Sequence, residues 1–380
     1  MKKIIPYGRQ FISREDIRYV SRSLKKDMIT SGNEVLKFEK EIQKYLKCRY
    51  STACSSGTSA LFLSLLSIGI KKNDIIVMPS INFVASYNVS KILGAKVYLA
   101  DVDKFSGQMS PENVIDVCKK FKLKKVKALI VMYNGGCPKN SENFFKLKKK
   151  LNCFIIEDAC HALGAEYKFN RKMLKIGSCR HSDICAFSLH PLKTITTGEG
   201  GIVTTNSKAL NQKIKKLRSL GIQKSSNKHW DYDVRITGFN FRLTDFQCSL
   251  GISQLKKIKI FIQRRNQIAK KYNFAFKKLN QLNIPHYVNN YRSSHHLYLI
   301  NLKKHNMKKK ENFMKYMIRN KILTQYHYKP VYKFKNFEGK YLSKNAEIYY
   351  KSTISLPIFY KLSSKEQNYV INKVNSFFNN

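Results

Sequence analysis

Five short apolar runs within residues 75–205 constrain the fold of this chain more than any other feature. They cover residues 75–78, 96–100, 128–132, 153–156 and 184–188, and at least ten residues separate each run from the next. Continuous apolar runs of this length are typical of strands that are buried on both faces, and the intervals leave room for helices. The pattern therefore predicts β-α units around a mostly parallel sheet, which is an α/β fold.

The chain is long enough for two domains. It has 380 residues, and its hydrophobic fraction of 43% is that of a globular protein. After residue 262 the pattern changes to a helix at 264–279, a strand-like run at 296–300, a lysine-rich helix near 308–320 and a closing amphipathic helix at 363–378. We expect a large domain at 1–262 that includes an N-terminal arm, and a smaller C-terminal α/β domain at 263–380.

The charge balance is strongly basic. Lys and Arg number 71 against 24 Asp and Glu, which gives a formal net charge of +47. Such a field attracts nucleic acid, anionic membranes or phosphate-bearing small substrates. The lysines are spread over most expected helices, and no arginine-rich arm stands out. A basic nucleic-acid-binding protein is therefore kept as an alternative from another functional class, although nucleic acid is not the expected partner.

Cysteine usage and hydropathy favour a soluble, cytoplasmic protein. The nine cysteines form no C-x-x-C pair and show no spacing typical of a metal site, so we expect reduced thiols and no metal. The first residues start like a signal peptide but lack its apolar region. The most apolar run, at 61–70, is too short to cross a bilayer, and no membrane association is expected.

A lysine in a threonine- and glycine-rich turn is the leading candidate for chemistry. Residues 188–201 are SLHPLKTITTGEGG, with Lys193 at the centre. A lysine attacks carbonyl carbons only as a neutral amine, which burial or a nearby cation favours. The glycines allow close approach of a flat cofactor, and Ser188 offers a hydroxyl for a phosphate. Most lysines are solvated surface groups, so Lys193 needs support from other residues.

Segment 51–60, STACSSGTSA, precedes an apolar helical run. Small hydroxyl residues in this position predict a helix N-terminus, whose free N–H groups bind anions and phosphate above all. A simple helix cap is the commoner meaning of such a string taken alone.

Two further segments lie just past predicted strands, where functional groups of parallel sheets gather. In 82–86, Phe83 could stack on a ring, although core packing is the commoner role of a phenylalanine. In 157–164, Asp158 could pair with a protonated ring nitrogen, with His161 nearby. A helix cap and a core histidine are the structural alternatives for these two residues. Together with Lys193, the segments favour a catalytic site.

These motifs, in this order, resemble the DegT/DnrJ/EryC1/StrS aminotransferases of nucleotide-sugar biosynthesis. The matching segments are GTSAL at 57–61, NFVAS at 82–86, EDACHALGAEY at 157–167, SLHPLKTITTGEGG at 188–201, GFNFRLTD at 238–245, LGISQLKK at 250–257 and TQYHYKPVY at 324–332. The resemblance extends from Tyr7 to residue 359, and the lysine segment is highly specific to the family. The segments SSHHLY at 293–298 and HYKP at 327–330 favour the pseudaminic acid branch.

The resemblance implies an aminotransferase fold of type I, a homodimer with active sites at the subunit interface, and pyridoxal 5′-phosphate as cofactor. It implies that Lys193 binds the cofactor covalently and transfers protons, that Asp158 pairs with the pyridine nitrogen, and that His161 and Phe83 lie against the ring. The implied phosphate ligands are Gly57, Thr58 and Ser188, joined by Asn240 of the partner subunit. The implied substrate contacts are Tyr7, Asp27, Met28, Ile29, Thr30, Gln325, Tyr326, His327 and Tyr328.

The reaction implied by the resemblance moves an amino group from L-glutamate to the C4 keto group of a UDP-linked 4-keto-6-deoxy-N-acetylhexosamine. Transfer to another nucleotide sugar, of the perosamine or bacillosamine type, is the alternative. A dehydratase of the same family is disfavoured, because those enzymes carry histidine at the position of Lys193. Three departures leave the exact sugar open: Leu189 replaces a usual aromatic residue, residues 27–28 are atypical, and Tyr326 stands where a small aliphatic residue is common.

Overall fold

A computed structural model describes residues 4–225, 228, 230–285 and 290–379. Its centre is an eight-stranded sheet in the order β1-β9-β8-β5-β4-β2-β3-β15. These strands are β1 (Tyr50–Cys54), β2 (Ile75–Pro79), β3 (Lys96–Ala100), β4 (Ala128–Met132), β5 (Phe154–Asp158), β8 (Ile184–Ser188), β9 (Gly201–Thr205) and β15 (Lys340–Tyr341). Strand β9 pairs antiparallel with β1 and β8, whereas the pairs from β8 to β15 are parallel. The predicted mostly parallel sheet is confirmed.

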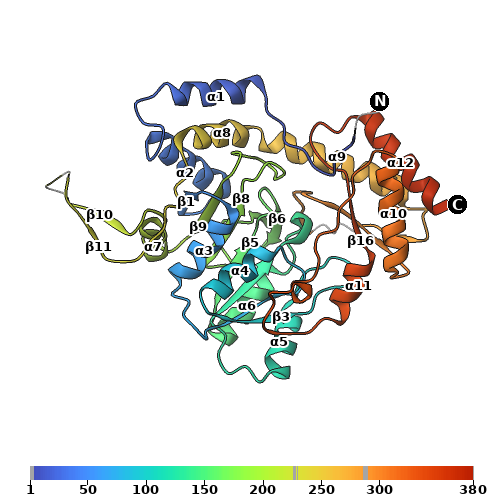
Figure 1. Cartoon of the computed structure of the whole chain (residues 1–380), viewed down its shortest axis with the longest axis horizontal. Helices are drawn as coiled ribbons and strands as arrows, with labels where there is room; N and C mark the ends of the chain where they lie inside the picture. The colour runs from blue at the N-terminus through green and yellow to red at the C-terminus, as the bar shows by residue number, and fades with distance from the viewer. Residues whose placement is uncertain (1–3, 226–227, 229, 286–289, 380) are drawn as a thin grey trace.

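Helices cover both faces of this sheet (Figure 1). They are α2 (Asn33–Leu46), α3 (Gly57–Ser67), α4 (Val84–Ile92), α5 (Pro111–Lys120), α6 (Ser141–Leu151), α7 (Lys208–Arg218) and α8 (Asp245–Lys256), and α1 (Arg14–Leu24) packs on the outside of α8. Successive residues of β4 point to opposite faces, and both faces are buried: Leu129 belongs to one hydrophobic cluster and Ile130 to the other. Burial on both sides explains why the strands have continuous apolar sequences.

The C-terminal part has its own hydrophobic cluster. It contains α9 (Ile258–Phe276), β12 (Leu282–Asn283), β14 (Tyr298–Leu302), α10 (Met307–Arg319), α11 (Lys344–Ser352), β16 (Thr353–Leu356) and α12 (Ser364–Asn379). Strands β12, β14 and β16 form a separate antiparallel sheet beside these helices. Because α9 runs unbroken across residue 262 and β15 returns to the large sheet, the division at 262–263 stays a prediction.

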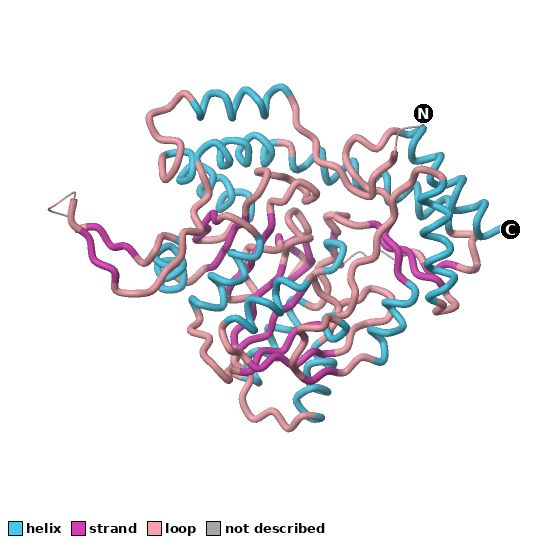
Figure 2. Tube along the Cα trace, viewed as in Figure 1, coloured by secondary structure: helices cyan, strands magenta, loops and turns pink. Residues whose placement is uncertain are grey.

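Short elements complete the described chain, and Figure 2 traces the strands and loops between the helices. They are β6 (Glu166–Phe169), β7 (Lys172–Lys175), β10 (Ile222–Lys224), β11 (Tyr232–Val234), β13 (Tyr291–Arg292), η1 (Asn134–Gly136) and η2 (Val331–Lys333). Strands β10 and β11 pair with each other and project from the body at the left of Figure 1.

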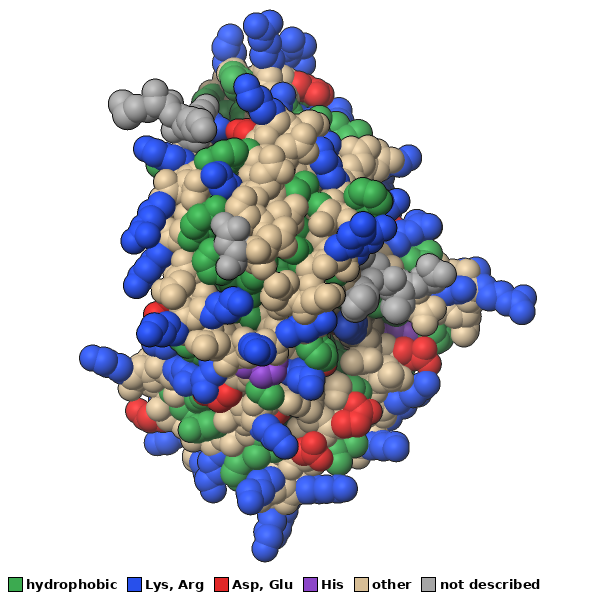
Figure 3. Space-filling view, turned by 90° about the vertical axis from the view of Figure 1, so that its right-hand side faces the viewer, with side chains coloured by type: hydrophobic (Ala, Val, Ile, Leu, Met, Phe, Trp, Pro, Cys, Tyr) green, Lys and Arg blue, Asp and Glu red, His purple; other side chains and the backbone are tan. Residues whose placement is uncertain are grey.

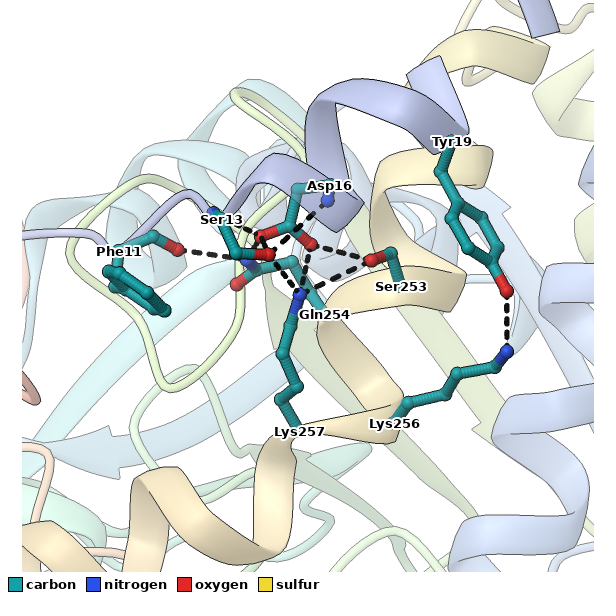
Figure 4. Close-up of polar contacts among 8 residues, drawn as sticks. All are labelled: Phe11, Ser13, Asp16, Tyr19, Ser253, Gln254, Lys256 and Lys257. Atoms are coloured by element: carbon teal, nitrogen blue, oxygen red, sulfur yellow. Dashed lines mark hydrogen bonds and ion pairs between the residues drawn. The ribbon is translucent and has the colours of Figure 1, made fainter. Parts of the chain in front are cut away.

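A buried carboxylate anchors the N-terminal arm to the large sheet's helices (Figure 4). Asp16 of α1 is 0% exposed and accepts hydrogen bonds from Ser253 Oγ at 2.7 Å, Gln254 Nε2 at 3.0 Å and Lys257 Nζ at 2.5 Å. Gln254 also donates to the backbone oxygen of Phe11 at 2.9 Å. The end of α8 thereby holds the segment that leads back to Tyr7.

Basic side chains are distributed widely. On the face drawn in Figure 3, lysine and arginine side chains project all around the outline and stand among neutral groups, with fewer acidic side chains between them. The charge of +47 is therefore not gathered into one patch on this face.

Among the described helices, none combines the length and the apolar character needed to cross a membrane.

Candidate active site

A cavity of about 340 Å³ opens where the strands of the large sheet end. Strand β5 ends at Asp158 and β8 at Ser188, while α3 begins at Gly57. Because parallel strands present their carboxyl ends at one edge, these residues meet although they are far apart in sequence. The predicted site residues that line the cavity are Tyr7, Gly57, Thr58, Phe83, Asp158, His161, Ser188, Lys193, His327 and Tyr328.

The N-terminus of α3 forms one end of the cavity. Ser56 caps the helix by accepting from the Ser59 amide at 3.0 Å. The amides of Gly57 and Thr58 have no hydrogen-bond partner among the described residues, and both residues line the cavity with Ser188. A Cβ on Gly57 would come within 2.7 Å of the Ser188 Cβ, so a side chain there would close this end. The arrangement suits an anion held by two amides and a hydroxyl.

Lys193 lies in the turn between β8 and β9. Its amide donates to the His190 oxygen at 2.9 Å, and the Thr196 hydroxyl pins the turn by donating to the Leu189 oxygen at 2.9 Å. Burial lowers the pKa of the Lys193 amine, while Cys160 and Asp158 oppose that shift. The lower pKa increases the fraction of neutral amine, the form that acts as a nucleophile and a base.

Asp158 is buried at the end of β5, where it is 4% exposed. Its Oδ2 accepts a hydrogen bond from the Ser86 hydroxyl at 2.7 Å, and its Oδ1 accepts from the Cys160 amide at 3.3 Å. Ser86 was not predicted as a site residue, although it lies in the predicted segment 82–86. A carboxylate held in this way can pair with a cationic group in the cavity.

His161 lies in the wall of the cavity between two other rings. Its Nδ1 accepts from the Gly135 amide at 3.4 Å, and its Nε2 is 2.7 Å from the Tyr328 hydroxyl. His296 packs on its other side with ring centroids 4.2 Å apart. Burial, with a further contribution from Lys193, holds the pKa of His161 well below its usual range. The lowered pKa favours the neutral ring, and the N–H donor at Nδ1 favours the tautomer with the proton on Nε2.

The opposite wall comes from the N-terminal arm and from segment 325–328. The Nδ1 of His327 is 2.7 Å from the Ser355 hydroxyl, and its ring centroid is 5.6 Å from that of Tyr7. Burial lowers the pKa of His327 to about 3, and Lys193 adds to the effect. Phe83 lies 5.7 Å from Tyr328 by ring centroids and is 55% exposed, which excludes the structural alternative that it packs in the core.

The remaining predicted residues do not line this cavity. Thr30 forms a bridge with Thr244, while Met28 and Ile29 are 55% and 47% exposed. The residues outside the cavity wall are Asp27, Met28, Ile29, Thr30, Asn240, Gln325 and Tyr326. Asn240 is exposed. It lies near the N-terminus of α3, because the backbone oxygen of its neighbour Phe241 accepts a hydrogen bond from the Ser55 amide. Tyr326 turns its ring toward Lys310 instead.

Several residues of the cavity were not predicted. They are Ser56, Leu61, Ala85, Met132, Cys160, His190, Leu192, Glu199 and His296. Most of them lie inside motifs already noted, so the motifs themselves were the available signal. His296 lies in the noted segment 293–298, just before β14, and its contact with His161 arises only through the fold.

Comparisons with known proteins identify the family of this chain. A model of the DegT/DnrJ/EryC1/StrS aminotransferase family matches residues 10–375. The chain is 35% identical to the UDP-4-amino-4,6-dideoxy-N-acetyl-β-L-altrosamine transaminase of Campylobacter jejuni, covering 97% of this chain and 96% of that protein. It is 31% identical to the GDP-perosamine synthase of Escherichia coli O157:H7, with 99% of both chains covered. The expected resemblance to the family is confirmed.

The fold agrees as well. The structure of PseC from Helicobacter pylori, an aminotransferase involved in pseudoaminic acid biosynthesis, has a TM-score of 0.91 to this chain at 30% identity. It covers 99% of this chain and 100% of that one. The expected α/β aminotransferase fold is therefore confirmed.

Proposed function

Because the chain belongs to the DegT/DnrJ/EryC1/StrS aminotransferase family, we propose that it is a pyridoxal-phosphate-dependent aminotransferase of nucleotide-sugar biosynthesis. The proposed donor is L-glutamate, and the proposed acceptor is the C4 keto group of a UDP-linked 4-keto-6-deoxy-N-acetylhexosamine of the pseudaminic acid type. The observation that carries the proposal is the meeting of Lys193, Asp158 and the start of α3 in one cavity. Family membership outweighs the nucleic-acid-binding alternative, which rested on charge alone.

The residues of the cavity fit pyridoxal phosphate. Two unpaired amides at Gly57 and Thr58 and the Ser188 hydroxyl suit its phosphate, and Gly57 leaves the room that a Cβ would fill. The buried Asp158 carboxylate suits its ring nitrogen, and the Lys193 amine suits its aldehyde. Phe83 and His161 are proposed to lie against the ring. When bound, the cofactor would supply a conjugated ring that accepts electrons from the reacting carbon.

The residues of this chain divide the work between binding and proton transfer. Burial lowers the pKa of the Lys193 amine, and its neutral Nζ would accept the proton from Cα of the amino donor and give it back later in the transfer. The Asp158 carboxylate would pair with the ring nitrogen of a bound cofactor and favour its protonated form. Ser86 fixes the direction of that carboxylate by donating to Oδ2. The neutral His161 contributes no charge that would oppose a cationic ring.

The second wall is proposed to select the sugar nucleotide. Tyr7, His327 and Tyr328 line this wall, and residues with hydroxyl and imidazole groups suit the hydroxyl, keto and acetamido groups of a hexosamine. The sequence relationship to a UDP-sugar transaminase supports the pseudaminic acid type. The relationship to a GDP-perosamine synthase keeps another nucleotide sugar as the alternative.

We also propose a homodimer with shared active sites. The support is the exposure of Asn240 close to the phosphate end of the cavity, together with exposed apolar side chains at Met28 and Ile29. Asn240 of the partner subunit would complete the phosphate site, and residues 27–30 would reach substrate across the interface. Mixing inactive Lys193→Ala and Asn240→Ala chains should restore activity, since one site of the heterodimer has both wild-type residues. No recovery after proven subunit exchange would contradict the shared site.

One experiment tests the function directly. Purified protein is incubated with pyridoxal phosphate, L-glutamate and a panel of UDP- and GDP-linked 4-keto sugars, and the products are identified by NMR. We expect a 4-amino sugar from the UDP-linked 4-keto-6-deoxy-N-acetylhexosamine. Borohydride reduction in the presence of the cofactor should label the peptide that contains Lys193. A label on another lysine would contradict the assigned role, and product from a GDP sugar alone would favour the perosamine type.

A further inference from the structure

A second buried lysine lies outside the cavity. Lys310 of α10 is 1% exposed, and it occupies the buried stripe of the helix with Phe313 and Met317. Spacing of three and four residues is that of a core face, so a cation stands where an apolar side chain is expected. Within the described residues, Lys310 forms no ion pair with a carboxylate. A lysine this deeply buried without an ion pair calls for a specific role.

The surroundings of the amine form a cage. The Lys310 Nζ donates a hydrogen bond to the backbone oxygen of Tyr350 at 2.5 Å. It also lies 4.4 Å from the ring centroid of Tyr326 and 4.7 Å from that of Tyr350, while the two rings meet edge to face at 5.6 Å. Both distances fall within the range of cation–π attraction. The amine thus joins α10, α11 and the segment that contains Tyr326.

That segment continues directly into the cavity wall. Tyr326 precedes His327 and Tyr328, which line the cavity. On its other side the segment pairs with β16, because Gln325 and Ser355 exchange backbone hydrogen bonds at 3.3 and 2.6 Å. Through Tyr326, this segment contacts the Lys310 side chain of α10.

We propose that Lys310 is a positioning residue. Its contact with the Tyr326 ring fixes the positions of His327 and Tyr328 in the cavity wall that binds the sugar nucleotide. This assigns Tyr326 a role behind the wall instead of the substrate contact expected from the sequence. The inference rests on the proposed function only for its kinetic test.

Tm and the kinetic constants of Lys310→Met distinguish a positioning role from a role in stability alone. Replacing a buried, unpaired amine with an apolar side chain of similar length is commonly neutral or stabilising, since the cost of desolvating the charge disappears. If Lys310 positions the wall, Lys310→Met should keep or raise Tm and yet impair substrate binding. If it serves stability alone, Tm should fall while the kinetic constants per folded molecule stay unchanged.

The test combines kinetics with histidine NMR on the full chain. We expect Lys310→Met and Tyr326→Leu each to raise KM for the sugar nucleotide about tenfold with little change in kcat, since small displacements of binding groups are costly. The double variant should be no worse than either single one, because both break the same contact. Lys308→Met changes an exposed lysine of the same helix and should match wild type.

The NMR measurement does not depend on activity. The ring signals of His327, assigned with a His327→Gln variant, should move in Lys310→Met and Tyr326→Leu and stay in place in Lys308→Met. Unchanged His327 signals together with an unchanged KM would overturn the inference. If the wild-type chain transfers no amino group, the proposed function fails, while the His327 signals still decide whether the cage positions the wall.

Discussion

The two walls of the cavity are built in different ways. One wall consists of strand ends and a helix start, so Asp158, Ser188 and Gly57 each take their place from a regular element. The other wall consists of irregular segments that carry Tyr7, His327 and Tyr328, and side chains from elsewhere hold these segments. Regular backbone gives the first wall a fixed geometry, whereas the geometry of the second depends on a few polar contacts.

This difference suggests a division of labour. The first wall holds the groups proposed for cofactor binding and proton transfer, which every substrate would use in the same way. The second wall holds the groups proposed for sugar recognition, which can vary without changing the chemistry. Substitutions in the first wall should therefore lower kcat, and substitutions that loosen the second should raise KM.

The largest effect is expected at Lys193. Lys193→Ala should lower kcat more than about 10⁴-fold, because the variant loses both the covalent attachment and the base. The folded state should persist, and circular dichroism with thermal melting checks this. Lys208→Ala, in an exposed position on α7, serves as the control and should keep wild-type kcat. Substantial turnover by Lys193→Ala would place the chemistry on another residue.

A large effect on stability is expected where the second wall begins. Asp16→Ala should lower the free energy of unfolding by about 3 kcal/mol, because Lys257 then stays buried without its partner. KM should rise as well, since the arm that carries Tyr7 loses its anchor. Urea unfolding and steady-state kinetics measure both quantities. Glu15→Ala, at an exposed neighbouring position, is the matched control.

The pH dependence of Asp16 has a definite sign. Burial raises the pKa of its carboxyl, but hydrogen bonds from Lys257, Ser13 and Ser253 outweigh burial and lower the pKa overall. A depressed carboxyl pKa stabilises the fold above the unfolded value of about 3.9. This stabilisation should be lost as the pH falls through the folded pKa. Acid unfolding of Asp16→Ala should consequently be less steep than that of wild type, and an equal slope would contradict the assignment.

Asp158→Asn tests the first wall more gently. The amide cannot keep a ring nitrogen protonated, so kcat should fall about 10²-fold or more while cofactor binding persists. Absorbance titration with pyridoxal phosphate measures binding, and steady-state kinetics measures turnover. Ser86→Ala removes only the hydrogen bond to Oδ2 and should have a smaller effect in the same direction. Wild-type kcat in Asp158→Asn would remove this carboxylate from the mechanism.

The contribution of Lys310 to the free energy of unfolding should depend on pH. Burial lowers the pKa of its amine to about 7, and Glu311 opposes the shift only in part. The unfolded lysine titrates near 10.4, so between these values the unfolded state binds more protons and stability rises with pH. The unfolding free energy of wild type, relative to Lys310→Met, should rise by at most about 1.4 kcal/mol per pH unit in this window. A flat difference would mean that the amine is not desolvated.

The smallest effect is expected from salt. A net charge of +47 should attract a nucleotide diphosphate, and screening shortens the Debye length from about 10 Å at 0.1 M to about 3 Å at 1 M. We expect kcat/KM for the sugar nucleotide to fall about fivefold over this range, with little change in kcat. Kinetics at several sodium chloride concentrations, with viscosity controlled, measure this. A constant kcat/KM would mean that the lysines have no part in capture.

Much of the first wall could be predicted from the sequence. The apolar runs identified the central strands of the sheet, and the segments around Gly57, Asp158 and Lys193 lie at its edge as expected. Strand β1 was missed because its sequence, YSTAC, contains hydroxyl residues and few apolar ones. Its position is decided by pairing with β9, which a local pattern does not reveal.

The sequence by itself determined the central strands of the sheet and the residues that end them, because continuous apolar runs mark strands that are buried on both faces. Only the tertiary structure decided that His296 packs on His161, that Phe83 is exposed, and that Tyr326 faces Lys310. The physical reason is that the burial of a side chain depends on segments far away in the chain. The burial of Lys310 could not be predicted from the sequence, because it results from the packing of α10 against α11.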